Sequence, residues 1–146
     1  MAIKLLYVTD GIAPYVMGGM QAVSRRHIKC LVDNDLELVI IYSRTDNHEK
    51  VELPGKTIYV EWPHSKGVMK YVPGHYVQEL KNYSKKVTQI LNNEKPDIVY
   101  TEGPLLYDYL QNSSQRIPVL FHPHGLEMFQ YKGSFLEDLS FMKICR

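Results

Sequence analysis

The sequence lacks the marks of several large protein classes. It has only two cysteines, Cys30 and Cys145, which are far apart and without metal-ligand spacing, as suits a reducing compartment. No apolar run approaches the roughly 20 residues that span a bilayer, and the apolar stretch 3–8 is too short for a signal peptide. The formal net charge of +1 gives no field to attract nucleic acid. We expect a soluble, cytoplasmic protein with no nucleic-acid partner.

Familiar catalytic and nucleotide-binding motifs are also missing. There is no G-x-S-x-G nucleophile elbow, no Walker sequence ending in Gly-Lys-Ser/Thr, and no G-x-G-x-x-G dinucleotide fingerprint. Nucleophilic serine catalysis therefore has little support. The length of 146 residues corresponds to about one domain with a single core.

What the sequence does show is an alternation of short apolar runs and helical patterns. Apolar runs predict buried strands at 5–8, 36–42, 57–62, 98–100 and 117–121. Helical patterns cover 20–31, 76–92 and 104–110, and a last one starts near 135. This alternation predicts a Rossmann-like, three-layer α/β domain with a mostly parallel sheet. The last pattern runs to the final residue, so we expect the chain to be half of a larger protein.

Two of the helical patterns predict which face is buried. The face expected for the first helix comprises Met20, Val23, His27, Cys30 and Leu31. The face expected for the second comprises Tyr76, Leu80, Tyr83, Val87 and Ile90. On this basis His27 is predicted to be a packed residue and not a ligand.

Candidate site residues follow three of the predicted strands. Ligands of open α/β sheets bind beyond the carboxyl ends of the strands. Gly18-Gly19 lies between the first strand and the first helix, where backbone N–H groups and the helix dipole favour phosphate, although an ordinary turn fits the pair as well. Glu102 follows the fourth strand and could accept hydrogen bonds from substrate hydroxyls or be a solvated loop carboxylate.

His124 follows the fifth strand, and three interpretations of its role are open. It could be a metal ligand together with His122 and Glu127. It could instead bind a sugar or phosphate through hydrogen bonds, or be a structural imidazole bonded to loop carbonyls. Glu127 by itself fits the first turn of a helix, where the dipole favours an acid.

Three segments taken together resemble a known family. They are Ile3 to Val8 followed by Pro14 and Gly18-Gly19, then Lys95 to Tyr100, and then Val119 to Glu127. In order and spacing they resemble the N-terminal half of the retaining glycosyltransferases of family 4. These enzymes have the GT-B fold, in which two Rossmann-like domains face each other across a cleft.

The resemblance implies a domain organisation and a chemistry. Residues 1–146 would be the N-terminal, acceptor-side domain, and the C-terminal donor-binding domain would be absent from this chain, so the isolated chain is expected to be inactive. The substrates implied are a nucleotide sugar and a carbohydrate or lipid-linked acceptor. The transfer would retain the anomeric configuration and need no bound metal or other cofactor.

The resemblance also suggests roles for individual residues. Gly18 and Gly19 would approach the donor diphosphate, and His124 would contact the transferring sugar. Tyr15 and Glu102 are assigned to the acceptor. The sequence departs from the family pattern at Met20-Gln21, where an acidic residue is usual after the glycines, and at Asn34-Asp35, where many members have Gly-His.

Three other interpretations stay open. The chain could be a free-standing Rossmann-like module that binds a ligand or a partner chain. It could be a metal-dependent hydrolase that uses His122, His124 and Glu127. The lysines at 81, 85 and 86 form the polar side of a helix or a weak peripheral contact with the anionic inner face of a membrane.

Overall fold

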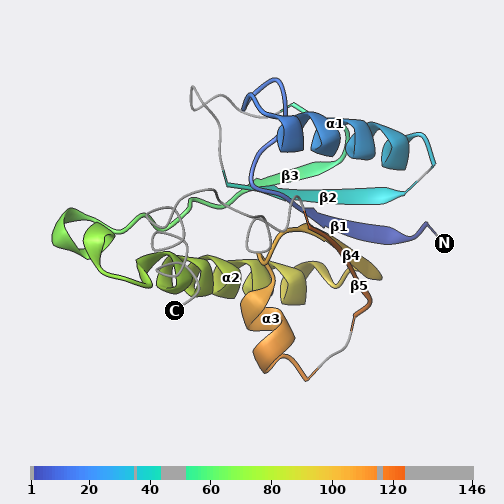
Figure 1. Cartoon of the computed structure of the whole chain (residues 1–146). Helices are drawn as coiled ribbons and strands as arrows, with labels where there is room; N and C mark the ends of the chain where they lie inside the picture. The colour runs from blue at the N-terminus through green and yellow to red at the C-terminus, as the bar shows by residue number, and fades with distance from the viewer. Residues whose placement is uncertain (1, 35, 44–51, 115–116, 124–146) are drawn as a thin grey trace.

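The computed structural model describes residues 2–34, 36–43, 52–114 and 117–123. These residues form three layers, in which a parallel sheet lies between helices (Figure 1). The strands are β1 (Lys4–Val8), β2 (Glu37–Tyr42), β3 (Lys56–Tyr59), β4 (Ile98–Glu102) and β5 (Val119–His122). Their order is β3-β2-β1-β4-β5, and every neighbouring pair is parallel. This confirms the predicted Rossmann-like α/β fold.

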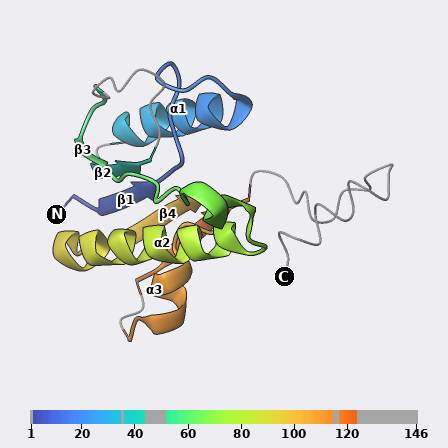
Figure 2. The same cartoon turned by 90° about the vertical axis from the view of Figure 1, so that its left-hand side faces the viewer.

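Helices cover both faces of the sheet. Helix α1 (Gly19–Val32) lies on one face, and α2 (His75–Glu94) and α3 (Tyr107–Asn112) lie on the other (Figures 1 and 2). A short 3-10 helix, η1 (Gly67–Tyr71), precedes α2. No helix in the described part of the chain is both long enough and apolar enough to cross a membrane.

The central strands β1, β2 and β4 are largely buried on both faces because their alternate side chains enter two separate clusters. Leu6, Val8 and Val99 belong to the cluster beneath α2 and α3, whereas Leu5 and Tyr7 belong to the cluster beneath α1. A parallel strand that is buried on both faces appears in the sequence as a continuous apolar run. The apolar runs of β1 and β2 were recognisable in the sequence for this reason.

Helix α2 buries the face that its sequence predicts, apart from its two ends. Leu80, Tyr83 and Val87 are buried, while Tyr76 is exposed and Leu91 takes the buried place expected for Ile90. The expected repeat of four and three residues ran slightly out of phase with the helix over these four turns.

The buried face of α1 differs from the prediction. The buried residues are Gln21, Ser24 and Ile28, while Met20 and Cys30 of the expected face are exposed. The pattern failed because the sheet presents polar groups to this helix, so two of its three buried side chains are polar.

Several element boundaries also moved. Strand β3 ends at Tyr59 and not at 62, and α3 begins at Tyr107 and not at 104. Strand β5 is shifted by one or two residues to Val119–His122, which brings His122 into the sheet. The helix expected near 135 lies outside the described residues.

A buried carboxylate fixes the segment between β3 and α2. Trp62 donates from Nε1 to Glu79 Oε2 at 2.9 Å, and the Ser65 backbone N–H donates to Oε1 at 2.6 Å. Burial of Glu79 works to raise its pKa, but the hydrogen bonds from Ser65 and Trp62 outweigh it and hold the pKa below its usual range. The nearby His75 lowers the pKa of Glu79 in the same direction.

Candidate functional site

The carboxyl ends of the five strands meet along one edge of the sheet, because all of the strands are parallel. The loop 9–18, the segment 60–66 and the turn at Gly103 leave from this edge, and β5 ends there at His122. Helix α1 begins at the same edge (Figure 1). This is the position at which open α/β sheets bind their ligands.

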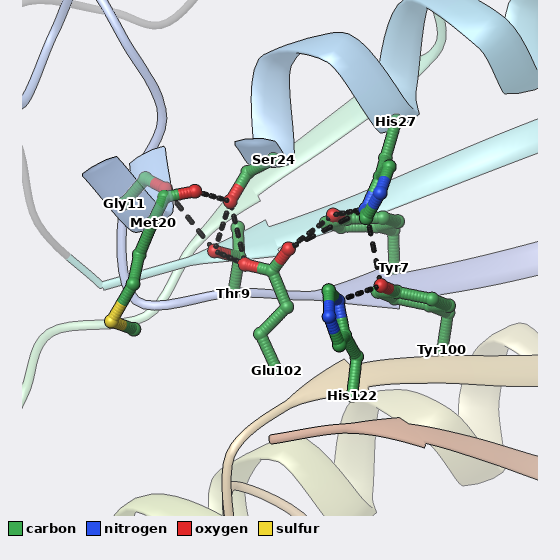
Figure 3. Close-up of polar contacts among 9 residues, drawn as sticks. All are labelled: Tyr7, Thr9, Gly11, Met20, Ser24, His27, Tyr100, Glu102 and His122. Carbon is green, nitrogen blue, oxygen red and sulfur yellow. Dashed lines mark hydrogen bonds and ion pairs between the residues drawn. The ribbon is translucent and has the colours of Figure 1, made fainter. Parts of the chain in front are cut away.

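Glu102, the last residue of β4, is the centre of a buried hydrogen-bond network at this edge (Figure 3). Tyr7 donates to its Oε1 atom at 2.5 Å, and Thr9 and Ser24 donate to its Oε2 atom at 2.7 and 2.5 Å. The side chain of Glu102 is only 1% exposed. Three hydroxyl donors replace the water that this carboxylate loses on burial.

Two histidines and two tyrosines extend the network along the sheet. The Tyr100 hydroxyl lies 3.1 Å from His27 Nδ1 and 2.7 Å from His122 Nδ1. The rings of Tyr7 and Tyr100 stack at a centroid distance of 4.7 Å, because these residues are partners in the β1–β4 register. Figure 3 shows the side chains from α1, β1, β4 and β5 converging.

The protons in this network are constrained by simple counting. The Tyr7 hydroxyl proton goes to Glu102, so Tyr7 can interact with His27 Nδ1, 3.4 Å away, only as an acceptor. Tyr100 has one hydroxyl proton and two neighbouring Nδ1 atoms. It can donate to one imidazole and must accept from the other. The two histidines are therefore linked through a single phenol.

Both phenols stay protonated over the physiological range. Burial, followed by the hydrogen bond to Glu102, raises the pKa of Tyr7 far above its usual range. Burial and the nearby Glu102 charge raise the pKa of Tyr100 as well. Tyr7 is therefore a permanent donor to the carboxylate.

The paired glycines lie at the amino end of α1, on the same edge as Glu102. Gly18 and Gly19 are both exposed. A Cβ atom on Gly18 would lie 2.1 Å from the side-chain oxygen of Gln21, whereas a Cβ atom on Gly19 would enter open space. A side chain at Gly18 would therefore require the flexible end of Gln21 to move, while Gly19 leaves its backbone open to a ligand.

Tyr15 lies in the loop that leads to these glycines. Its hydroxyl accepts from the backbone N–H of Glu52 at 3.0 Å and lies 3.2 Å from the backbone oxygen of the same residue. Tyr15 is half-buried and ties the loop after β1 to the segment before β3. Its assignment to the acceptor stays a prediction.

The sequence located part of this site. Glu102 was singled out, but as a residue just beyond the strand; it is the last residue of β4, and it is buried, which is the opposite of a solvated loop carboxylate. Its acceptor role stays a prediction. His124 and Glu127 lie outside the described residues, so their roles stay predictions too.

Five further residues of the network were missed or misread. His27 is half-exposed and contacts two phenols, so it is more than a packing residue. The others are Tyr7, Thr9, Ser24 and Tyr100. The predicted parallel sheet could have indicated some of them, because residues at the carboxyl ends of adjacent parallel strands become neighbours.

Comparison with known proteins supports the fold and gives the family. The structure of sucrose-phosphate synthase from Thermosynechococcus elongatus superposes with a TM-score of 0.65 at 13% identity, which shows a shared fold. The match covers 97% of this chain and 39% of that one, so the chain spans well under half of that protein's length. No curated protein matches the chain. The model of Glycosyltransferase Family 4 matches residues 17–144, most of the sequence, and the chain therefore belongs to that family.

Proposed function

We propose that this chain is the N-terminal, acceptor-side domain of a nucleotide-sugar-dependent glycosyltransferase. The proposal rests on what lies at the edge of the sheet where α1 begins. There the exposed backbone of Gly18 and Gly19 meets the amino end of a 14-residue helix, an arrangement suited to an anionic diphosphate. Family membership gives the class of reaction.

In this proposal the donor diphosphate lies against Gly18 and Gly19, and His124 contacts the sugar that is transferred. Strand β5 carries the chain to Pro123 at the same edge as the glycines, which supports a common site. Tyr15 and Glu102 are assigned to the acceptor. Glu102 would act on it indirectly, through the hydroxyl groups that surround its carboxylate.

The finer features of the proposal follow the family resemblance. Transfer retains the anomeric configuration and takes place in the cytoplasm, with a carbohydrate or lipid-linked molecule as acceptor. A second, C-terminal domain holds most of the donor, so this chain alone does not catalyse sugar transfer. Lys85 and Lys86 are exposed on α2, where they would support contact with an anionic membrane surface, whereas Lys81 lies over the Tyr107 ring.

The test uses a longer protein that joins this chain to a donor-binding domain. We expect His124→Ala to lower kcat/KM about 100-fold, the loss typical of removing one group that stabilises developing charge. His64→Ala is the matched control, because His64 is exposed and has no assigned role. Unchanged turnover in His124→Ala would refute the role of His124. No transfer from any nucleotide sugar by the joined protein would refute the proposed function.

A further inference from the structure

We propose that His27, Glu102 and His122 form a binding site for a divalent cation of the zinc class. Each residue offers one ligand atom, and these atoms all lie within 4.8 Å of one another. Among the residues that the structure describes, this is the one group of at least three such side chains with that geometry. The three residues come from α1, β4 and β5, so a cation here would join the helix to two strands.

The donor set determines the kind of cation. Two imidazoles and one carboxylate are the ligands of many zinc sites, in which a water molecule completes the tetrahedron. Tetrahedral bonds of about 2.0–2.1 Å would place the ligand atoms about 3.3 Å apart. His27 Nδ1 and Glu102 Oε1 lie 3.9 Å apart. Small side-chain rotations therefore suffice to bring this pair into coordination.

The carboxylate is already oriented for coordination. Thr9 and Ser24 both donate to Oε2, which leaves Oε1 as the atom that faces His27. Oε1 also accepts from Tyr7, which holds the carboxylate in this orientation. Outer hydrogen bonds of this kind hold metal ligands in place in known sites.

The two imidazoles also point toward a common place. Tyr100 lies within hydrogen-bond distance of both Nδ1 atoms, so its hydroxyl group bridges them when no cation is bound. A cation would replace that bridge. The side chain of His27 is 37% exposed and that of Glu102 is 1% exposed, so the site has a buried negative charge and an open side for entry.

The cation has a structural role in this proposal and takes no part in sugar transfer. It differs from the set of His122, His124 and Glu127 considered from the sequence, because here His122 is grouped with His27 and Glu102. The proposal does not depend on the glycosyltransferase function. Zinc binding can be measured with no nucleotide sugar present, so the two proposals can fail separately.

The experiment titrates the complete chain with Zn²⁺ after chelator treatment and dialysis, with a chromophoric chelator as competitor. We expect one Zn²⁺ per chain. His27→Gln and His122→Gln should each weaken binding by about 100-fold or more, and Tyr7→Phe by about 10-fold, because Tyr7 acts through Glu102. His64→Gln, at an exposed position, should leave the affinity unchanged. Co²⁺ in place of Zn²⁺ should give the visible spectrum of a tetrahedral site.

Stability gives a second measurement on the same samples. Saturating Zn²⁺ should raise the Tm of the parent chain by about 5 °C and leave the Tm of His27→Gln unchanged. His27 is half-exposed, so this variant is expected to fold, and far-ultraviolet circular dichroism checks that it does. The proposal fails if the chain binds no stoichiometric Zn²⁺. It also fails if His124→Ala and Glu127→Ala abolish binding while His27→Gln does not.

Discussion

Replacing Tyr7 by Phe tests whether the hydroxyl donors of the network stabilise the buried carboxylate of Glu102. The substitution keeps the ring that stacks on Tyr100 at 4.7 Å and removes the hydroxyl that donates to Oε1 at 2.5 Å. Tyr7 is fully buried, so water cannot easily replace the lost donor. The measured effect should therefore belong mainly to the hydrogen bond with Glu102, with a smaller part from the longer contact of the hydroxyl with His27 Nδ1 at 3.4 Å.

The expected magnitude follows from the charge of the acceptor. A hydrogen bond to a charged group contributes about 1.5–3 kcal/mol net, and the carboxylate keeps its two bonds from Thr9 and Ser24. We expect Tyr7→Phe to lower the free energy of unfolding by about 2 kcal/mol. Glu102→Ala should lower the free energy of unfolding further, by about 3 kcal/mol, because three buried hydroxyl groups lose a charged acceptor and Thr9 and Ser24 keep only the backbone oxygens of Gly11 and Met20.

Urea unfolding at pH 7, followed by circular dichroism, measures both changes. The midpoint should fall while the slope m stays the same, which indicates a loss of stability without a change in the surface exposed. Tyr42→Phe is the matched control, because Tyr42 is a buried tyrosine on the same face of the sheet, and it should lower the free energy of unfolding clearly less than Tyr7→Phe does. If Tyr7→Phe costs no more than Tyr42→Phe, the hydroxyl does not stabilise the carboxylate.

Three further predictions concern other parts of the chain. The pKa of Glu79 is depressed in the folded chain, so its contribution to stability should be complete above about pH 4.5 and be lost as the pH falls through the folded pKa. Urea titrations from pH 7 to 3 measure this loss, and Glu79→Gln should make the free energy of unfolding depend less on pH over the acid part of that range. Gly19→Ala should leave the Tm unchanged or slightly higher, since its Cβ meets open space, yet weaken nucleotide-sugar binding to the joined protein by calorimetry; unchanged binding would contradict the assignment of Gly19 to the diphosphate. Gly18→Ala should lower the Tm only slightly, because its Cβ displaces the flexible end of Gln21. Leu91→Ala should lower the free energy of unfolding by about 2–5 kcal/mol, and Ile90→Ala by clearly less, because Leu91 is buried and Ile90 only half-buried. If urea unfolding gives the reverse order, α2 is rotated about its axis relative to this structure.

The sheet could be predicted because each strand carries its own signal. Strands β1 and β2 pack on both faces, so their burial appears in the sequence as unbroken apolar runs, and the expected ends were within one residue. Strand β4 was expected to end at Tyr100, since Thr101 and Glu102 are polar. Its polar last residues nevertheless stay in the sheet, because Thr101 and Glu102 are buried and paired with Phe121 and His122 of β5.

The buried face of α1 could not be predicted from periodicity. A helical pattern is recognised by apolar spacing, and this helix buries Gln21 and Ser24 beside a single large apolar residue, Ile28. Ser24 is buried because it donates to Glu102, which is 78 residues further along the chain. No local pattern contains that information, since the partner becomes a neighbour only when β4 pairs with β1.

The same contact suggests why a polar helix face is retained here. An apolar residue in place of Ser24 would bury more hydrophobic surface, and replacing buried charges and their partners by apolar groups is often neutral or stabilising. Ser24 lies just over one turn from Gly19, however, and its hydrogen bond to Glu102 joins the start of α1 to the end of β4. A directional bond fixes the rotation of a helix, which non-directional apolar packing does less strictly. We therefore expect the bond between Ser24 and Glu102 to help fix how α1, and the paired glycines at its start, lie on the sheet.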